Sequence, residues 1–218
     1  MQIRDLSTHS SIINQYLREL RDKSIQQDRL RFVTNVKRTG MLIGYEISKE
    51  LDYHKATTQT VLGAAKTHEL VTQPVLATVL RAGLPFHQGM LDVFDQADSA
   101  FITAYRRLGS DGAMQSVIEY VACPPLDGRP LIIADTMIAT GTTLVDTYYE
   151  LMKYGKPSVV YAASVLASKP AIEYIGRHIP DLVLFAAAID DKLNDEFLIF
   201  PGLGDAGDLI YGEKSPRQ

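Results

Sequence analysis

Residues 131–147 read Leu-Ile-Ile-Ala-Asp-Thr-Met-Ile-Ala-Thr-Gly-Thr-Thr-Leu-Val-Asp-Thr, and the organisation of the chain can be worked out from this stretch. Four apolar residues at its start predict a buried strand that ends at Asp135. Small and hydroxylated residues follow at 139–143, and apolar positions with helical spacing begin at Leu144. The stretch therefore predicts a strand, a loop and the first turns of a helix.

A loop that ends at a helix N-terminus suits a phosphate group. Backbone N–H groups converge there and carry a partial positive charge, and the threonine hydroxyls of residues 140–143 add further donors. Asp135 would repel a phosphate, so we expect it to accept hydrogen bonds from sugar hydroxyls or to hold Mg²⁺ through water. The stretch thus indicates a site for a phosphorylated sugar, and an ordinary strand-to-helix turn capped by threonine is the alternative.

Length and composition limit the class of protein. The chain has 218 residues, of which 46% are apolar, so a single α/β domain can bury a sizeable core. Its formal net charge of −4 argues against nucleic acid as the main partner. A lone cysteine, Cys123, excludes an internal disulfide and fits a reducing compartment such as the cytoplasm. No apolar run approaches the ~18 residues of a membrane span, so we expect none.

Strands and helices alternate from residue 74 onward. The expected strands are 75–80, 99–105, 116–122, 131–134, 159–165 and 182–188, and the helices between them are 84–94, 144–152 and 169–177. This alternation predicts βαβ units and a parallel sheet. Ahead of it we expect a helix over 9–22, a longer helix capped by Asp28, and a hairpin with strands 55–62 and 67–72 around a turn at 63–66. We expect this front third to pack on the core and to offer an oligomer interface.

Charged residues follow several of the predicted strands. Arg81, Arg106, Asp135 and the acids at 190–191 all come directly after an apolar run. Ligands of parallel sheets bind beyond the carboxyl ends of the strands, so these arginines suit a phosphorylated ligand. For Asp190 and Asp191 we expect a solvated strand end rather than a magnesium site. The five histidines show no metal-ligand spacing, so we expect no metal bound by protein side chains alone.

Residues 202–207, Gly-Leu-Gly-Asp-Ala-Gly, match the dinucleotide-binding pattern G-x-G-x-x-G. That pattern requires a strand before it, a helix after it and an acidic residue about 20 positions further on. Too few residues follow Gly207 for this arrangement. We therefore interpret the segment as a glycine-rich loop whose backbone can approach a flat ligand closely, with a terminal turn packed on the sheet edge as the alternative.

Several of these segments together resemble one family. Residues 135–143 resemble the signature with which type I phosphoribosyltransferases bind phosphoribosyl pyrophosphate (PRPP). Residues 80–84 (Leu-Arg-Ala-Gly-Leu), 105–106 (Tyr-Arg) and 200–208 (Phe-Pro-Gly-Leu-Gly-Asp-Ala-Gly-Asp) resemble the uracil phosphoribosyltransferases in particular. The resemblance implies an α/β fold of the type I phosphoribosyltransferases, in which a central, mostly parallel sheet is flanked by helices. It also implies an N-terminal helical segment, a β-hairpin arm and a C-terminal base-binding loop.

The resemblance also implies an activity and a set of site residues. The family's enzymes are glycosyltransferases (pentosyltransferases) that join uracil to PRPP, releasing diphosphate and giving UMP for pyrimidine salvage, with Mg²⁺ bound with PRPP. The implied catalytic residues are Asp135, Arg106 and Asp205. The implied PRPP-binding residues are Arg81, Arg106, Asp135, Thr136, Met137, Ile138, Ala139, Thr140, Gly141, Thr142, Thr143 and Asp205, and the implied uracil-binding residues are Ile199, Gly204, Asp205 and Ala206.

The chain departs from the family pattern at three places. Thr136 stands where the uracil enzymes usually have proline, Phe200 where they usually have an aliphatic residue, and the segment 107–112 carries fewer charges. A phosphoribosyltransferase for another base, or a non-catalytic regulator that senses PRPP or UMP, is therefore the alternative function. We expect a cytoplasmic homodimer or higher homo-oligomer that binds neither nucleic acid nor membrane.

The chain shows no linker or internal repeat, so we expect one domain over residues 1–218. Within it we expect N-terminal helices and the hairpin at 1–73, a PRPP-binding core at 74–190 and a uracil-binding loop at 191–218.

Overall fold

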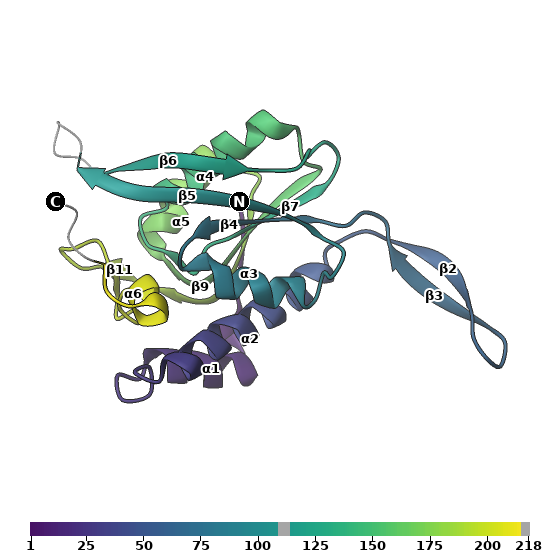
Figure 1. Ribbon diagram of the computed structural model, residues 1–218, viewed down its shortest axis with the longest axis horizontal. Coiled ribbons are helices and arrows are strands. Elements are labelled where there is room, and N and C mark those ends of the chain that lie inside the picture. Colours follow the sequence, from purple (N-terminus) through teal and green to yellow (C-terminus); the bar gives the residue numbers. More distant parts are fainter. Residues whose placement is uncertain (109–113, 215–218) are drawn as a thin grey trace.

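The computed structural model describes residues 1–108 and 114–214, with backbone alone for 105–108 and 114–116 (Figure 1). Within these residues the centre of the fold is an eight-stranded sheet. In spatial order its strands are β1 (Gln2–Asp5), β10 (Val183–Asp190), β9 (Val159–Ser168), β7 (Pro130–Ala134), β4 (Val75–Leu80), β5 (Asp98–Leu108) and β6 (Met114–Ala122), and β8 (Met137–Ile138) pairs with β9. Only β5 and β6 run antiparallel, so the predicted, mostly parallel sheet is confirmed.

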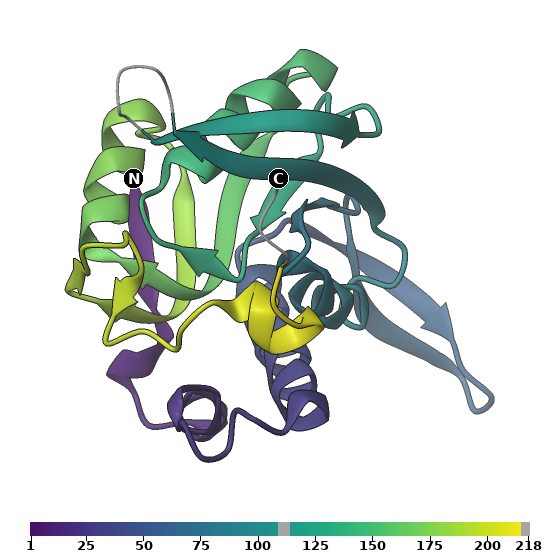
Figure 2. The same ribbon diagram turned by 60° about the vertical axis from the view of Figure 1, so that its left-hand side comes forward.

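Helices cover both faces of the sheet (Figures 1 and 2). Because successive side chains of a strand point to opposite faces, Leu76 and Ile132 pack in one core cluster, and Ala77 and Ile133 pack in another. The first face is covered by α1 (Ile12–Arg21), α2 (Arg29–Ser48) and α3 (Gly83–Leu91), and the second by α4 (Thr142–Leu151) and α5 (Lys169–His178). Short 3₁₀ helices, η1 (Leu6–Thr8) and η2 (Met152–Tyr154), follow β1 and α4.

The structure adds elements that the sequence patterns did not predict. Strand β1 lies at the edge of the sheet and pairs in parallel with β10, although its four residues are mostly polar and partly exposed. The C-terminal segment contains a two-stranded sheet of β11 (Lys192–Leu193) and β12 (Ile199–Phe200), followed by α6 (Ala206–Tyr211). These elements depend on neighbours distant in the chain, and their own periodicity is too short to detect.

The long helix capped by Asp28 is confirmed, since the Asp28 side chain accepts a hydrogen bond from the backbone N–H of Arg31. Gly40 weakens the helical pattern but serves the packing of α2 on α3. A Cβ at position 40 would lie 2.2 Å from the carbonyl oxygen of Phe86, so only glycine allows the two helices this close approach.

A buried carboxylate joins α1 to α2. Arg31 donates to both oxygens of Glu19 at 2.8 Å, and Asn35 donates to the same carboxylate at 2.7 Å. These donors hold the pKa of Glu19 at about 2, below its ordinary value of 4.5, with the Arg31 hydrogen bond as the largest cause. Glu19 therefore stays ionised over the physiological range and keeps the two helices together.

The predicted hairpin is confirmed as β2 (Tyr53–Gln59) and β3 (Ala64–Leu70), which project from the body of the molecule (Figure 1). The turn lies at 60–63 rather than at 63–66, because the Thr60 side chain bonds the backbone of Gly63. Val61 and Leu62 at its tip are 101% and 98% exposed. In the part of the chain that the structure describes, no helix is long and apolar enough to cross a membrane.

Candidate active site

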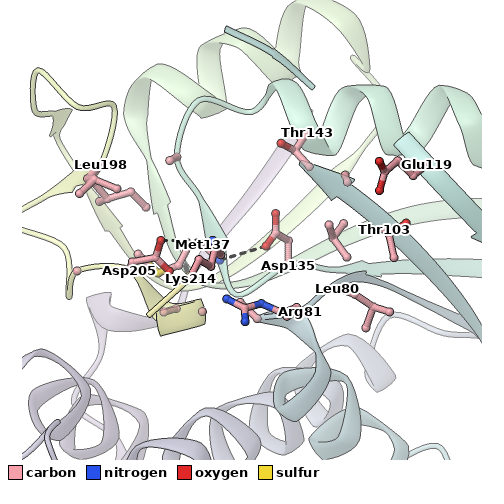
Figure 3. A pocket seen from close by; sticks show the side chains of 18 residues that line it. Leu80, Arg81, Thr103, Glu119, Asp135, Met137, Thr143, Leu198, Asp205 and Lys214 are labelled. Carbon is pink, nitrogen blue, oxygen red and sulfur yellow. Dashed lines mark hydrogen bonds and ion pairs between the residues drawn. The ribbon is translucent and has the colours of Figure 1, made fainter. Parts of the chain in front are cut away.

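A cavity of about 1010 Å³ opens at the edge of the sheet where β4 and β7 end, beside the middle of β5 (Figure 3). Three regions that lie far apart in the sequence line it. The first is the end of β4 and the residues after it, Val79, Leu80, Arg81 and Ala82, and the second is the segment after β7, Asp135, Met137, Ala139 and Thr143. The third, near the C-terminus, contributes Leu198, Ile199, Gly204, Asp205, Ala206, Gly207 and Lys214, and β5 and β6 add Thr103, Ala104 and Glu119. The fold thus brings together most segments that the sequence analysis singled out.

The loop between β7 and α4 forms one wall of the cavity. Asp135 follows the last residue of β7, and one of its carboxylate oxygens accepts a 3.3 Å hydrogen bond from the backbone N–H of Met137. Gly141 is the N-cap of α4, and the hydroxyls of Thr140 and Thr142 lie 2.8 Å apart beside this helix start. The predicted order of strand, loop and helix N-terminus is therefore confirmed.

Not every residue of this loop faces the cavity. Asp135, Met137, Ala139 and Thr143 line it. Ile138 is buried, and Thr140, Gly141 and Thr142 lie at the helix start without belonging to the lining. A phosphate held by the helix start would meet mainly backbone N–H groups and threonine hydroxyls.

Thr136 is buried, lies outside the cavity lining and connects two of the cavity walls. Its hydroxyl donates a 2.7 Å hydrogen bond to the carbonyl oxygen of Ala82, the residue after Arg81. Its own carbonyl accepts hydrogen bonds from the backbone N–H of Leu166 and the hydroxyl of Ser164. The threonine at this position therefore ties the loop after β7 to the loop after β4, a connection that a proline side chain could not make.

The loop after β7 is also held from its other side. Ser168, at the end of β9, donates a 2.6 Å hydrogen bond from its hydroxyl to the carbonyl oxygen of Ala139. The same hydroxyl caps α5 by accepting from the backbone N–H of Ala171. Hydrogen bonds to two distant segments, the loop after β4 and the end of β9, therefore hold the backbone of this loop.

Two arginines were predicted at the ends of strands. Arg81 follows β4 and lines the cavity, with its Nη2 3.5 Å from an oxygen of Asp208 and its guanidinium 5.7 Å from the centre of the Tyr211 ring (Figure 3). The backbone of Arg106 lies in β5, opposite Ser116 of β6. The side chain of Arg106 lies outside the described part of the chain.

The C-terminal loop forms the opposite wall. Ile199, Gly204, Asp205 and Ala206, the residues for which the resemblance implies base binding, all line the cavity. Asp205 caps α6 by accepting a 3.1 Å hydrogen bond from the backbone N–H of Asp208, and its other oxygen lies 3.9 Å from Nζ of Lys214. The glycine-rich segment is a loop, as predicted, but its last residues already belong to α6 because Asp205 starts this short helix.

The prediction for the acids at the end of β10 was wrong for one of them. Asp191 is exposed and pairs with Lys169 at 2.6 Å. Asp190 is not solvated: it is 8% exposed and accepts two 2.8 Å hydrogen bonds from the guanidinium of Arg21. Arg21 lies at the end of α1, far from Asp190 in the sequence, so no local pattern could have indicated the pair.

Cys123, the one cysteine of the chain, is not activated as a nucleophile. Cys123 donates from its Sγ to the carbonyl oxygen of Pro124, and burial raises the pKa of its thiol to about 11, so it stays protonated. Among the described residues, His, Cys, Asp and Glu side chains form no group of three that could hold a metal ion.

Sequence reasoning missed several residues of the lining. Lys214 adds a cation beside Asp205, and Glu119 adds an acid from β6. Neither belongs to a motif, and only the fold brings them to the cavity. Thr103 and Ala104 lie in the middle of β5, and they reach the cavity because Thr103 pairs with Leu80, the last residue of β4.

The fold is that of the type I phosphoribosyltransferases, in which a mostly parallel sheet has a cavity at its strand ends and a helix begins beside that cavity. The solved structure of a hypoxanthine phosphoribosyltransferase from Staphylococcus aureus has this fold in common with the chain: the TM-score is 0.50 at 12% identity, over 74% of this chain and 76% of that chain.

Sequence comparison narrows the class. A family model described as "Uracil phosphoribosyltransferase" matches residues 7–213. A uracil phosphoribosyltransferase of Porphyromonas gingivalis is 43% identical over 215 residues, which cover 98% of this chain and all of that protein. A solved structure of a protein from Aquifex aeolicus has a TM-score of 0.86 and 28% identity, over 97% of this chain and 98% of that chain. The chain belongs to the uracil phosphoribosyltransferase family.

The Thr136 hydrogen bond can be tested by substitution. Thr136→Val keeps the shape of the side chain but leaves the Ala82 carbonyl without its donor, which costs roughly 1–2 kcal/mol of the free energy of unfolding. Thr136→Ser keeps the hydroxyl and is expected to retain most of that stability. Urea denaturation of both variants measures the difference, and equal stability of the valine and serine variants would contradict this role.

Proposed function

We propose that the protein is a uracil phosphoribosyltransferase that converts uracil and PRPP to UMP and diphosphate in pyrimidine salvage. One observation carries the proposal. The loop at 135–143 and the loop at 199–206, the first typical of PRPP binding and the second of uracil binding, line the same cavity. Membership of the uracil phosphoribosyltransferase family supports it independently.

In this proposal the loop after β7 binds the phosphoribosyl half of PRPP. Backbone N–H groups at the start of α4 and the hydroxyls of residues 140–143 hold the 5-phosphate. The Asp135 carboxylate holds the ribose 2- and 3-hydroxyls, either by accepting hydrogen bonds from them or through a magnesium ion. Thr136 contributes by holding the backbone of this loop against Ala82.

Arg81 and Arg106 are proposed to bind the pyrophosphate group. The bond from C1 of the ribose to the pyrophosphate oxygen breaks while the bond from C1 to N1 of uracil forms. The pyrophosphate gains negative charge, and fixed cations beside it stabilise this charge. Arg81 is half-exposed and pairs only weakly with Asp208, so an anionic ligand can take over its guanidinium. The ribose becomes oxocarbenium-like, so the reaction needs no covalent nucleophile.

The residues present fit a magnesium ion that arrives with PRPP. Asp135 places a carboxylate in the cavity, while no three ligands of a closed protein site come together among the described residues. Mg²⁺ keeps several waters and prefers phosphate oxygens with one or two carboxylates, which matches such an open site. The ion would supply positive charge next to the pyrophosphate and the ribose hydroxyls.

The C-terminal loop is proposed to select uracil. Fixed backbone N–H and C=O groups at 199 and 204–206 can pair with O2, N3–H and O4 of uracil. Cytosine has an acceptor at N3 and an amino group at position 4, so the same groups would remain unpaired, at about 1–3 kcal/mol for each buried group. Asp205 lines the cavity, and we assign it to contact with the substrate or Mg²⁺ where base and sugar meet. A second role that this position allows is to accept the proton from N1 of uracil.

We also propose a homodimer or higher homo-oligomer in the cytoplasm. The hairpin arm carries two fully exposed apolar side chains, Val61 and Leu62, at the tip of an isolated two-stranded sheet. Such a sheet is at best marginally stable in water, and its exposed apolar tip favours burial against another copy.

The composition supports the proposed compartment and partners. The single cysteine supports a reducing compartment, and the net charge of −4 argues against a nucleic-acid partner. We also propose that the single domain has three functional parts: the N-terminal helices and hairpin arm at 1–73, the PRPP-binding core at 74–190 and the uracil-binding loop at 191–218.

A base-panel assay tests the function. Purified protein is incubated with PRPP, Mg²⁺ and one of uracil, cytosine, hypoxanthine, adenine or orotate, and the nucleotide products are separated. We expect UMP from uracil and little or no product from the other bases. A clear preference for another base would replace uracil as the substrate, and PRPP binding without any product would indicate a regulator.

Asp135→Asn tests the ribose contact. The amide keeps the size of the side chain but loses the negative charge, so turnover is expected to fall about tenfold or more with the fold intact. Steady-state turnover and circular dichroism measure the two effects. An unchanged turnover number would remove Asp135 from the catalytic site.

The oligomer interface is tested by the double variant Val61→Ser, Leu62→Ser. Since it removes the apolar tip of the arm, we expect a smaller assembly by sedimentation velocity at equal concentration. Leu30→Ser, which changes an exposed leucine on α2 outside the hairpin, serves as the control and is expected to keep the wild-type mass. An assembly of unchanged mass in the double variant would exclude the tip as the interface.

A further inference from the structure

An ion pair outside the cavity holds the base loop. Arg21 is the last residue of α1, and Asp190 is the last residue of β10. The guanidinium donates from Nη1 and Nη2 to the two oxygens of the carboxylate, each at 2.8 Å. The side chain of Asp190 is 9% exposed and that of Arg21 is 25% exposed, so the pair is largely shielded from water.

Both members of the pair also bind the backbone of Gly202. The N–H of Gly202 donates to Oδ2 of Asp190 at 3.0 Å, and its carbonyl accepts from Nη1 of Arg21 at 3.0 Å. The paired side chains therefore bind both the N–H and the carbonyl oxygen of this one residue. Charge-assisted hydrogen bonds of this kind are stronger and more directional than those between neutral groups.

Gly202 carries the hydrogen bonds that attach the loop to the body of the protein, beside the apolar packing of Ile199, Leu203 and Ala206 in the core. Within the described residues, the hydrogen bonds that connect 201–204 to the rest of the fold all run through Gly202. Gly202 has a φ of +57°, and a Cβ there would lie 2.1 Å from the carbonyl oxygen of Ile199. This backbone conformation requires glycine, and the hydrogen bonds of the pair hold it in place.

The residues on both sides of Gly202 line the cavity. Ile199 precedes it by three positions and Gly204 follows it by two, and both belong to the lining, whereas Gly202, Arg21 and Asp190 do not. A shift of Gly202 would therefore move the backbone groups that face the cavity. The loop after β7, in contrast, is held by Thr136 and Ser168.

We propose that Arg21 and Asp190 are positioning residues that set uracil recognition by fixing the backbone of the base loop at Gly202. The inference rests on the proposed function, because it assigns this loop to the base. The proposal predicts different effects on the two substrates. Loss of the pair weakens uracil binding and the discrimination against cytosine, and it leaves PRPP binding unchanged.

Kinetics with each substrate varied in turn test the proposal. Arg21→Met removes the donors and keeps the aliphatic part of the side chain. We expect its KM for uracil to rise about tenfold or more and its KM for PRPP to stay within about twofold of the wild type. The ratio of kcat/KM for uracil to that for cytosine is expected to fall. Arg21→Lys, which keeps the charge and one donor group, is expected to restore part of the uracil affinity.

Arg31→Met is the matched control. Arg31 also makes two 2.8 Å hydrogen bonds to a buried carboxylate, that of Glu19, and it also joins α1 to a neighbouring element, but it does not contact the base loop. It is expected to lose stability in urea and to keep both KM values. If the uracil KM rises equally in Arg31→Met and Arg21→Met, Arg21 acts only on the stability of the protein and the positioning role is contradicted.

Two further results would overturn the proposal: an unchanged uracil KM in Arg21→Met, or an equal rise in both KM values. If Arg21→Met does not fold, as judged by circular dichroism, Arg21→Lys and Asp190→Asn decide by the same criteria. Wild-type protein is assayed in parallel, so an absence of UMP there contradicts the proposed function and is distinct from a failure of the positioning role.

Discussion

The site depends on the order of the strands in the sheet. From β4 the chain continues to β5 on one side, and then returns to β7 on the other side of β4, from which β9 and β10 follow outward. The strand order thus reverses between β4 and β7, and a crevice forms at the carboxyl ends of strands wherever this happens. Arg81 and Asp135 follow these two strands directly, so one constraint of topology places a cation and a carboxylate in the same cavity.

Buried hydrogen bonds convert this crevice into a site of defined shape. Thr136 connects the loop after β7 to Ala82, Ser168 holds the same loop at Ala139, and the Arg21–Asp190 pair fixes Gly202. Each bond joins segments that are far apart in the sequence. The residues that face the cavity are therefore supported by side chains behind them.

Sequence patterns predicted the parts of the molecule in which local rules decide. The apolar run at 131–134, the acid that ends it and the glycine and threonines that start α4 each follow from strand burial and helix capping. Alternation of such units predicted the parallel sheet, and the rule of strand ends brought Arg81 and Asp135 to one edge. The position of the 199–206 loop at the same cavity followed only from the resemblance. No periodic pattern of apolar residues predicts where this loop lies relative to the sheet.

The remaining features required the three-dimensional structure. Asp190 looked like a solvated strand end because its partner, Arg21, lies in another helix. The role of Thr136 depends on a carbonyl of Ala82 that becomes its neighbour only through the pairing of β4 with β7. Strand β1 is polar and short, and it forms by pairing with β10, which lies far away in the sequence. In each case the information is in a contact between distant segments.

The central claim is that one cavity has a phosphoribosyl half after β7 and a base half in the C-terminal loop. A crystal structure of the protein with bound UMP tests it most directly. The account predicts the phosphate of UMP at residues 139–143, the ribose hydroxyls at Asp135, and the uracil ring against the backbone of residues 204–206. UMP bound outside this cavity, or bound within it with the base at the start of α4, would contradict the account.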